Sequence, residues 1–148
     1  MTISRLRSRA AAFAVLALAG VGCSPTTVLN ALQPDGSVRE ARGVAFTEGP
    51  RGKLDVYAPA GAAGDAPVVV FFYGGSWDSG SRDMYGFVGK ALAARGIVTM
   101  IPDYRIYPEV RYPDFLRDNA KAVRWARDHA AEYGGDAGKL VLMGHSAG

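Results

Sequence analysis

The residues best suited to chemistry form the stretch GHSAG, at positions 144–148 of a 148-residue chain. This stretch follows the apolar run 140–143 and spells the pattern G-x-S-x-G. Directly after a strand, the pattern predicts a tight strand-to-helix turn that exposes the hydroxyl of Ser146 as a nucleophile. Glycines on both sides suit the crowded backbone of such a turn. An ordinary glycine-rich loop is the alternative interpretation.

A second candidate is the stretch YGGSW at residues 73–77, which follows the apolar run 68–72. A Gly-Gly pair after a buried strand lets main-chain N–H groups face a cavity. Such donors stabilise the negative oxygen that forms when an ester carbonyl is attacked. We therefore predict an oxyanion hole built from the main chain of four residues: Gly74, Gly75, Ser76 and Ala147. A simple turn that carries an exposed tryptophan is the alternative.

Two further motifs accompany these stretches, DYR-x₂-PE at residues 103–109 and GD-x₂-K at residues 135–139. In this order the four motifs resemble α/β-hydrolase carboxylesterases. The resemblance is strongest to the branch with hormone-sensitive-lipase-like, feruloyl-esterase-like and kynurenine-formamidase-like enzymes, and it covers about residues 40–148. It implies a small-molecule ester substrate, no cofactor and no metal. The family usually has histidine where Tyr73 stands, which puts the geometry of the oxyanion loop in question.

A serine nucleophile needs a histidine base and an acid that orients it. The resemblance places both after residue 148, so we expect a domain truncated after the nucleophile turn. The favoured hypothesis is a serine hydrolase that cleaves carboxylic esters. The alternatives are a non-catalytic binding protein of the same fold and an inactive gene fragment. We expect the isolated chain to be inactive and prone to aggregation, because the strand before Ser146 would be an unprotected edge.

The N-terminus is typical of an export signal. Three arginines precede the apolar stretch 10–21, which is too short for an ordinary membrane span. The residues before Cys23 resemble a bacterial lipoprotein cleavage site, with Gly20 in place of the usual leucine. We predict a signal peptide at 1–22, a tether at 23–41 and the hydrolase domain from 42. Cleavage after residue 19, giving a periplasmic or secreted protein, and an uncleaved anchor are the alternatives.

Composition excludes several other functions. Cys23 is the only cysteine, so an internal disulfide cannot form and a zinc cluster is not expected. If Cys23 carries the lipid, no free thiol remains. The net charge of +3 comes from the three signal arginines, because the remaining 14 basic residues balance 14 acidic ones. This balance gives no electrostatic reason to expect nucleic-acid binding. The sequence leaves the oligomeric state unknown.

Alternating apolar runs and helical patterns predict the fold class. Continuous apolar runs suit parallel strands that are buried on both faces. We expect an α/β-hydrolase fold, with a mostly parallel sheet and flanking helices. The predicted strands are residues 43–47, 54–58, 68–72, 97–101 and 140–143, and the predicted helices are 83–95 and 114–132. Both Gly74 and Ser146 then follow the carboxyl ends of strands, where such sheets bind ligands.

The apolar spacing also predicts which helix faces are buried. In the first helix the stripe is Met84, Phe87, Val88, Ala91 and Leu92, and in the second it is Leu116, Ala120, Val123 and Ala130.

Other polar and aromatic residues have weaker predictions. His145 is expected to pack or to wall the pocket rather than act as the base, and His129 to be an exposed helical histidine. An ion pair of Asp103 with Arg105 or Arg111 is a hypothesis. Turn and strand-start roles are expected for Asp136 and Lys139, and either pocket or core packing for Tyr73 and Trp77.

Overall fold

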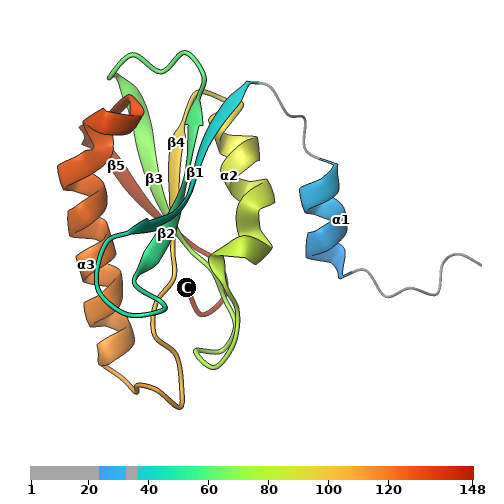
Figure 1. Ribbon diagram of the computed structural model, residues 1–148, viewed down its shortest axis with the longest axis vertical. Coiled ribbons are helices and arrows are strands. Elements are labelled where there is room, and N and C mark those ends of the chain that lie inside the picture. Colours follow the sequence, from blue (N-terminus) through green and yellow to red (C-terminus); the bar gives the residue numbers. More distant parts are fainter. Residues whose placement is uncertain (1–23, 33–36) are drawn as a thin grey trace, which may run out of the picture.

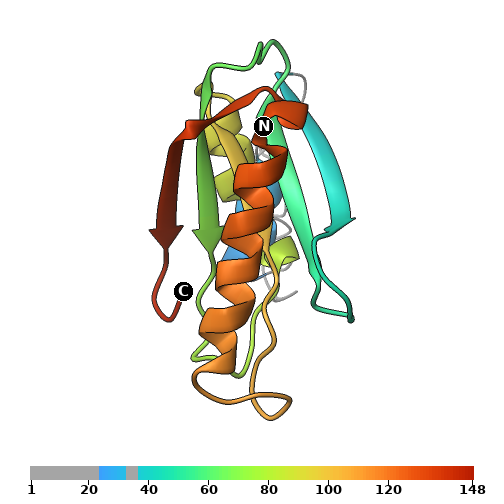
Figure 2. The same ribbon diagram turned by 90° about the vertical axis from the view of Figure 1, so that its left-hand side faces the viewer.

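The computed structural model describes residues 24–32 and 37–148. Cys23 and the predicted signal peptide lie outside these residues. The described elements form one layered unit, in which a twisted sheet has helices on both faces (Figures 1 and 2). In chain order they are α1 (Pro25–Ala31), β1 (Val38–Ala45), β2 (Lys53–Pro59), β3 (Ala66–Phe72), the 3₁₀ helix η1 (Arg82–Tyr85), α2 (Gly86–Ala93), β4 (Val98–Pro102), α3 (Asp114–His129), the 3₁₀ helix η2 (Ala130–Tyr133) and β5 (Gly135–Gly144).

The described strands form a mixed sheet in the order β1-β2-β4-β3-β5. The pairs β1–β2 and β2–β4 are antiparallel, whereas β3 is parallel to both β4 and β5. The three strands of the predicted alternating region therefore form the parallel part, and the early pair forms an antiparallel edge. In the register of β3 and β5, Phe72 lies opposite Gly144. Both candidate motifs consequently leave the sheet side by side at its carboxyl edge.

The segment read as a tether holds two elements in the structure. Residues 25–31 form α1, which Ser24 caps by accepting a hydrogen bond from the N–H of Thr27. β1 then begins at Val38 and ends at Ala45, so the strand starts earlier than predicted.

The buried face of α2 differs from the predicted stripe. Its buried residues are Gly86, Gly89 and Ala93, whereas Met84 is exposed. The reason is the fully buried ring of Tyr57, against which α2 packs with its backbone. A Cβ on Gly89 would lie 2.1 Å from Cδ2 of Tyr57. Small residues therefore set the closest contact between this helix and the sheet, while Val88 and Leu92 of the predicted stripe are partly buried against the core.

The predicted face of α3 is correct only in part, since Ala130 is buried and Val123 packs against the core. Leu116 and Ala120 are exposed, whereas the buried residues of the helix are Asp118, Ala122 and Ala126. An ion pair with Arg105 draws Asp118 inward, with 2.7 Å between Nε and Oδ2. This pair and the small alanines allow α3 to lie close to β3, β4 and β5.

β5 lies at the edge of the described sheet (Figure 2). It pairs with β3 alone, and the large apolar residues Val141, Leu142 and Met143 are exposed. The apolar run was predicted to be buried on both faces, so its burial is not as expected. The edge position agrees with the expectation that the strand before Ser146 would be unprotected.

Candidate active site

The turn after β5 has the geometry of a nucleophile turn. His145 N–H donates to the carbonyl of Phe72 at 3.1 Å, and Gly148 N–H donates to the carbonyl of His145 at 3.0 Å. Between them Ser146 has φ of 57°, a left-handed conformation that is unfavourable for a residue with a side chain. The bend raises Ser146 to an exposed position at the tip. An exposed serine in a strained backbone matches the arrangement predicted from the sequence.

The flanking glycines are required by clearance. A Cβ on Gly144 would lie 2.5 Å from the carbonyl oxygen of Gly148. A Cβ on Gly148 would lie 2.1 Å from the carbonyl oxygen of Phe72. Neither space admits a methyl group, because each clash is with backbone. The G-x-S-x-G pattern is thus explained by close packing of the turn on the end of β3.

The Gly74 loop touches this turn. A Cβ on Gly74 would lie 2.8 Å from Cβ of Ser146 and 2.8 Å from the carbonyl oxygen of His145. The two corners predicted to converge therefore lie in contact, although 72 positions separate Gly74 from Ser146 in the sequence. This proximity was the geometric condition on which the catalytic hypothesis depended.

The backbone of the Gly74 loop curls through three left-handed residues. The φ angles are 140° at Gly75, 53° at Ser76 and 60° at Trp77. The carbonyl of Gly75 accepts hydrogen bonds from the N–H of Asp78 and from both N–H and Oγ of Ser79, at 2.9 to 3.0 Å. These bonds hold residues 75–79 in a tight turn around the carbonyl of Gly75.

Main-chain donors remain at the corner of the two loops. Within the described part of the chain, the N–H groups of Gly75, Ser76 and Ala147 donate no hydrogen bond to a protein atom. Ser76 is exposed and Gly75 and Ala147 are half-buried, so these N–H groups are open to water or to a ligand. Gly75 and Ser76 follow Gly74, which contacts Ser146, and Ala147 is the next residue of the turn, so these donors come from the two segments that meet.

A buried hydrogen bond fixes the start of the loop. Tyr73 is fully buried, and its hydroxyl donates to Oδ1 of Asp103 at 2.6 Å. Arg51 donates to the same hydroxyl at 3.2 Å. Burial and the neighbouring Asp103 carboxylate raise the pKa of Tyr73 far above its ordinary value. The phenol therefore stays protonated and remains a donor to Asp103.

Asp103 is in turn held by Arg82. The main-chain N–H of Arg82 donates to Oδ1 of Asp103 at 2.9 Å, and its guanidinium contacts Oδ2. The same guanidinium donates to Asp55 on β2 at 2.9 Å, and Arg42 donates to the other oxygen of Asp55 at 2.9 Å. Side chains of alternating charge, from Arg42 through Asp55 and Arg82 to Asp103, thus connect β1 and β2 to the end of β4. Asp103 in turn binds Tyr73, which follows β3. The predicted pairing of Asp103 with Arg105 or Arg111 is wrong, because Arg82 occupies that place.

Tyr104 also holds Tyr73, at the start of the Gly74 loop, in place. Its ring stacks on that of Tyr73, with 4.9 Å between centroids, and its hydroxyl donates to the carbonyl of Tyr73 at 2.6 Å. Burial raises the pKa of Tyr104 to about 12. Tyr73 is therefore a core residue, whereas Trp77 is exposed and stacks on Phe115 with 6.0 Å between centroids. A role for Trp77 in an acyl pocket stays a prediction.

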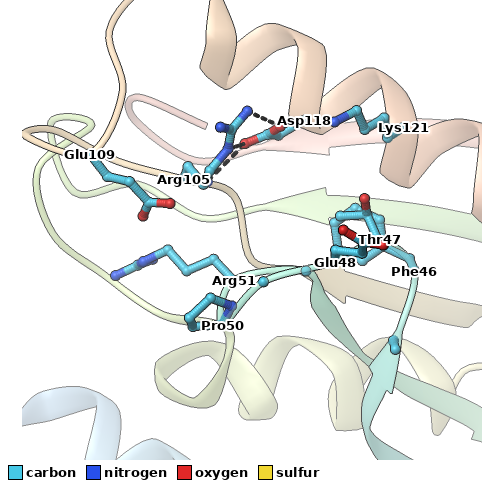
Figure 3. Close-up of a pocket in the computed structure, with 12 residues that line it drawn as sticks. Phe46, Thr47, Glu48, Pro50, Arg51, Arg105, Glu109, Asp118 and Lys121 are labelled. Atoms are coloured by element: carbon cyan, nitrogen blue, oxygen red, sulfur yellow. Dashed lines mark hydrogen bonds and ion pairs between the residues drawn. The ribbon is translucent and has the colours of Figure 1, made fainter.

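Arg105 and Glu109 line a different cleft. This cleft of about 860 Å³ lies between the β1–β2 turn and α3, and neither Gly74 nor Ser146 borders it (Figure 3). In it Arg105 binds Asp118 through both its side chain and its main-chain N–H. Burial opposes the charged form of Asp118, but these hydrogen bonds outweigh it and lower its pKa.

The two histidines differ in their surroundings. Nδ1 of His145 lies 3.2 Å from the hydroxyl of Tyr85, which places the ring against η1 as predicted for a packing role. His129 was predicted to be exposed, but it is half-buried. Its ring stacks on Trp125 with 4.2 Å between centroids, and Nδ1 lies 2.9 Å from the carbonyl of Trp125.

Asp136 and Lys139 lie at the start of β5, in agreement with their predicted turn and strand-start roles. Asp136 accepts a hydrogen bond from the N–H of Gly138 at 2.8 Å and pairs with Lys139 at 3.4 Å.

Sequence reasoning missed the charged network under the loop. Asp55 offered a signal, since it is an acidic residue inside the otherwise apolar run LDVYA of β2. A buried acid of this kind needs a cationic partner. Nothing in the local pattern identified Arg82 as that partner, because it lies in η1, 27 residues further along the chain.

The described residues hold neither a metal-binding cluster nor a helix that could span a membrane. No group of three or more histidine, cysteine or acidic residues there could hold a metal ion. In the same part of the chain, no helix has the length and apolar character needed to cross a bilayer.

Comparison with known proteins identifies the family. The family model described as BD-FAE matches residues 54–148. The chain belongs to this family. It is 36% identical over 107 residues to the probable isoprenylcysteine alpha-carbonyl methylesterase ICMEL1 of Arabidopsis thaliana, covering 72% of this chain and 22% of the relative. It is 41% identical over 95 residues to carboxylesterase NlhH of Mycobacterium tuberculosis, covering 63% of this chain and 30% of the relative.

Solved structures give the same result for the fold. Esterase B from Lactobacillus rhamnosis superimposes with a TM-score of 0.76 at 25% identity, over 94% of this chain and 44% of that protein. An esterase from Pyrobaculum calidifontis gives 0.67 at 30% identity, over 83% and 39%. These similarities confirm the predicted α/β-hydrolase fold. The BD-FAE chain spans less than a third of the length of the two curated relatives above.

We expect Tyr73→Phe to lower the free energy of unfolding by about 1–3 kcal/mol, because the buried Asp103 carboxylate loses a donor. Urea denaturation measures the change. Tyr112→Phe is the matched control, since Tyr112 is exposed. Equal stability of the two variants would show that the Tyr73 hydroxyl does not support the loop.

Proposed function

We propose that this chain supplies the nucleophile and the oxyanion hole of a serine hydrolase that cleaves carboxylic esters. The observation that carries the proposal is the contact of strained Ser146 with the Gly74 loop, whose following N–H groups find no acceptor among the described residues. The names of the relatives, which include methylesterases and a carboxylesterase, support an ester as the substrate.

In the proposed reaction, Oγ of Ser146 attacks the carbonyl carbon of the ester as a histidine base takes its proton. The electrons of the carbonyl bond move to its oxygen, which the N–H groups of Gly75, Ser76 and Ala147 stabilise. One such donor contributes about 3 to 4 kcal/mol in known hydrolases. Collapse of the intermediate releases the alcohol, which takes the proton from the histidine. Water then hydrolyses the acyl enzyme by the same steps.

The base is not His145 in this proposal. Its ring nitrogen lies against Tyr85, and it sits on the same tight turn as the nucleophile. A base must instead reach Oγ from across the site. We assign that role to a histidine, with its orienting acid, from sequence that follows residue 148.

We expect Ser146→Ala to abolish hydrolysis of a short-chain nitrophenyl ester by the full-length protein with its acid and histidine. The loss follows because no other hydroxyl occupies the strained turn. The assay compares kcat/KM with that of Ser37→Ala, an exposed serine outside the site. Turnover unchanged by Ser146→Ala would refute the proposed mechanism.

We expect Gly74→Ala to lower kcat by about 100-fold or more, because the new methyl group would push the loop away from Ser146 and misplace the oxyanion donors. Gly61→Ala is the control, since a Cβ there meets nothing within 4 Å. Steady-state kinetics of both variants, at matched thermal stability, test the effect. A Gly74→Ala enzyme with normal kcat would contradict an oxyanion role for this loop.

We also propose that the protein is exported and attached to a membrane through a lipid on Cys23. The support is the sequence alone: an arginine-rich start, a short apolar stretch and a single cysteine after small residues. We expect radiolabelled palmitate to enter the wild-type protein and not the Cys23→Ser variant. Absence of label on the wild type would leave the periplasmic or secreted alternative.

A further inference from the structure

Helix α1 turns its polar side toward the protein and its apolar side toward solvent. Asn30 faces the protein, where its side-chain amide donates to the carbonyls of Asp83 and Met84 at 3.4 Å. Thr26, one turn earlier, is also half-buried. The large apolar residues of α1 are instead exposed, including Leu32 directly after the helix, which is 72% exposed. An ordinary surface helix buries its apolar side and exposes its polar one.

The exposed apolar residues share one face. Val28 and Leu32 are four positions apart and Leu29 lies three before Leu32, so their side chains are neighbours. Asn30 is two positions from Val28, about 200° around the helix. The apolar face therefore points away from the protein. Figure 1 shows α1 beside α2, on the side of α2 that faces away from the sheet. Met84, in η1 on the Asn30 side of α1, is a further exposed apolar residue near the helix.

The sequence around α1 indicates what covers this face. Residues 24–34, which directly follow Cys23, contain no charged side chain. Within this stretch, α1 begins two residues after Cys23. We propose that the face made by Val28, Leu29 and Leu32, called here the α1 face, lies in the interface of a lipid bilayer. An apolar helix face beside an uncharged segment suits the boundary between headgroups and acyl chains.

The surroundings of α1 predict the chemistry of the contact. A shallow cleft behind the helix is lined by Asn30, Arg42, Asp83 and Lys90. Its cations are paired, since both Arg42 and Lys90 bind Glu40, at 3.0 and 3.2 Å. The balanced charge offers no excess for anionic headgroups. The α1 face therefore binds lipid by apolar burial, and the contact is insensitive to salt.

The position of this surface bears on the proposed function. α1 rests on η1, and Tyr85 at the end of η1 contacts His145 beside the proposed nucleophile. Only α1 and η1 would thus separate a bilayer on the α1 face from the turn that carries Ser146. The inference rests on the proposed membrane attachment only for bringing α1 to the bilayer, and it does not require that the serine be catalytic.

The test supplies the attachment artificially. In the full-length protein, residues 1–22 are replaced by a hexahistidine tag that binds phosphatidylcholine vesicles with a few per cent of nickel-chelating lipid. Cys23→Ser removes the only cysteine. Leu32→Cys then provides a single position for an environment-sensitive fluorophore. Ala31→Cys is the matched control, since Ala31 is exposed on the same helix but about 100° from Leu32.

We expect emission from position 32 to rise roughly threefold on vesicles, with strong quenching by spin-labelled lipid and less than half of this response at position 31. The response should persist in 0.5 M salt and need no anionic lipid. Val28→Cys gives a second position on the same face and should behave like Leu32→Cys. Because the tag replaces the acyl chain, this result is independent of palmitate labelling and of ester hydrolysis.

Other outcomes overturn the proposal. Equal responses at positions 31 and 32 would show that the α1 face has no preference for lipid. A response that rises with protein concentration and resists lipid quenching would assign the face to a second copy of the chain. A response abolished by salt would replace apolar burial with an electrostatic contact.

Discussion

The hydrogen-bonded cluster of Tyr73, Asp103 and Arg82 is the interaction on which the candidate site depends. It joins the end of β3 to the end of β4 and to the loop that precedes α2. Burying a carboxylate carries a large desolvation cost, which good geometry and several donors must offset. Asp103 receives such donors from a phenol, a main-chain N–H and a guanidinium. The result is a fixed starting point for the Gly74 loop, whose N–H groups must not move if they are to stabilise charge.

The motifs at residues 73–77 and 144–148 could be recognised in the sequence because short-range contacts require their glycines. Gly144 and Gly148 are required by contacts within the turn and with the end of the adjoining strand, so their local pattern can be recognised in the sequence. Strands β3 and β4 were predicted equally well, because their burial in the sheet requires continuous apolar residues. Ion-pair partners that are distant in the sequence could not be predicted. Asp103 could pair with any nearby arginine on sequence grounds, and only the path of the loop after Gly80 brings Arg82 to it.

Helix faces were predicted less well, for a common physical reason. Apolar spacing assumes that the largest apolar residues point to the core. In α2, Gly89 lies against the ring of Tyr57, and in α3, Asp118 turns inward to Arg105. Each contact rotates its helix relative to the predicted stripe, and neither is encoded in the helix sequence alone. Exposed Leu116 and Met84 are the consequence.

Strand β3 positions both halves of the proposed site. Its last residue, Phe72, accepts the hydrogen bond from His145 that anchors the nucleophile turn. The next two residues are Tyr73, which is locked to Asp103, and Gly74, which contacts Ser146. β5 pairs only with β3 among the described strands, so the position of Ser146 is set from this side. A shift of β3 would therefore move nucleophile and oxyanion donors together and preserve their relative geometry, whereas a change at Tyr73 would move the donors alone.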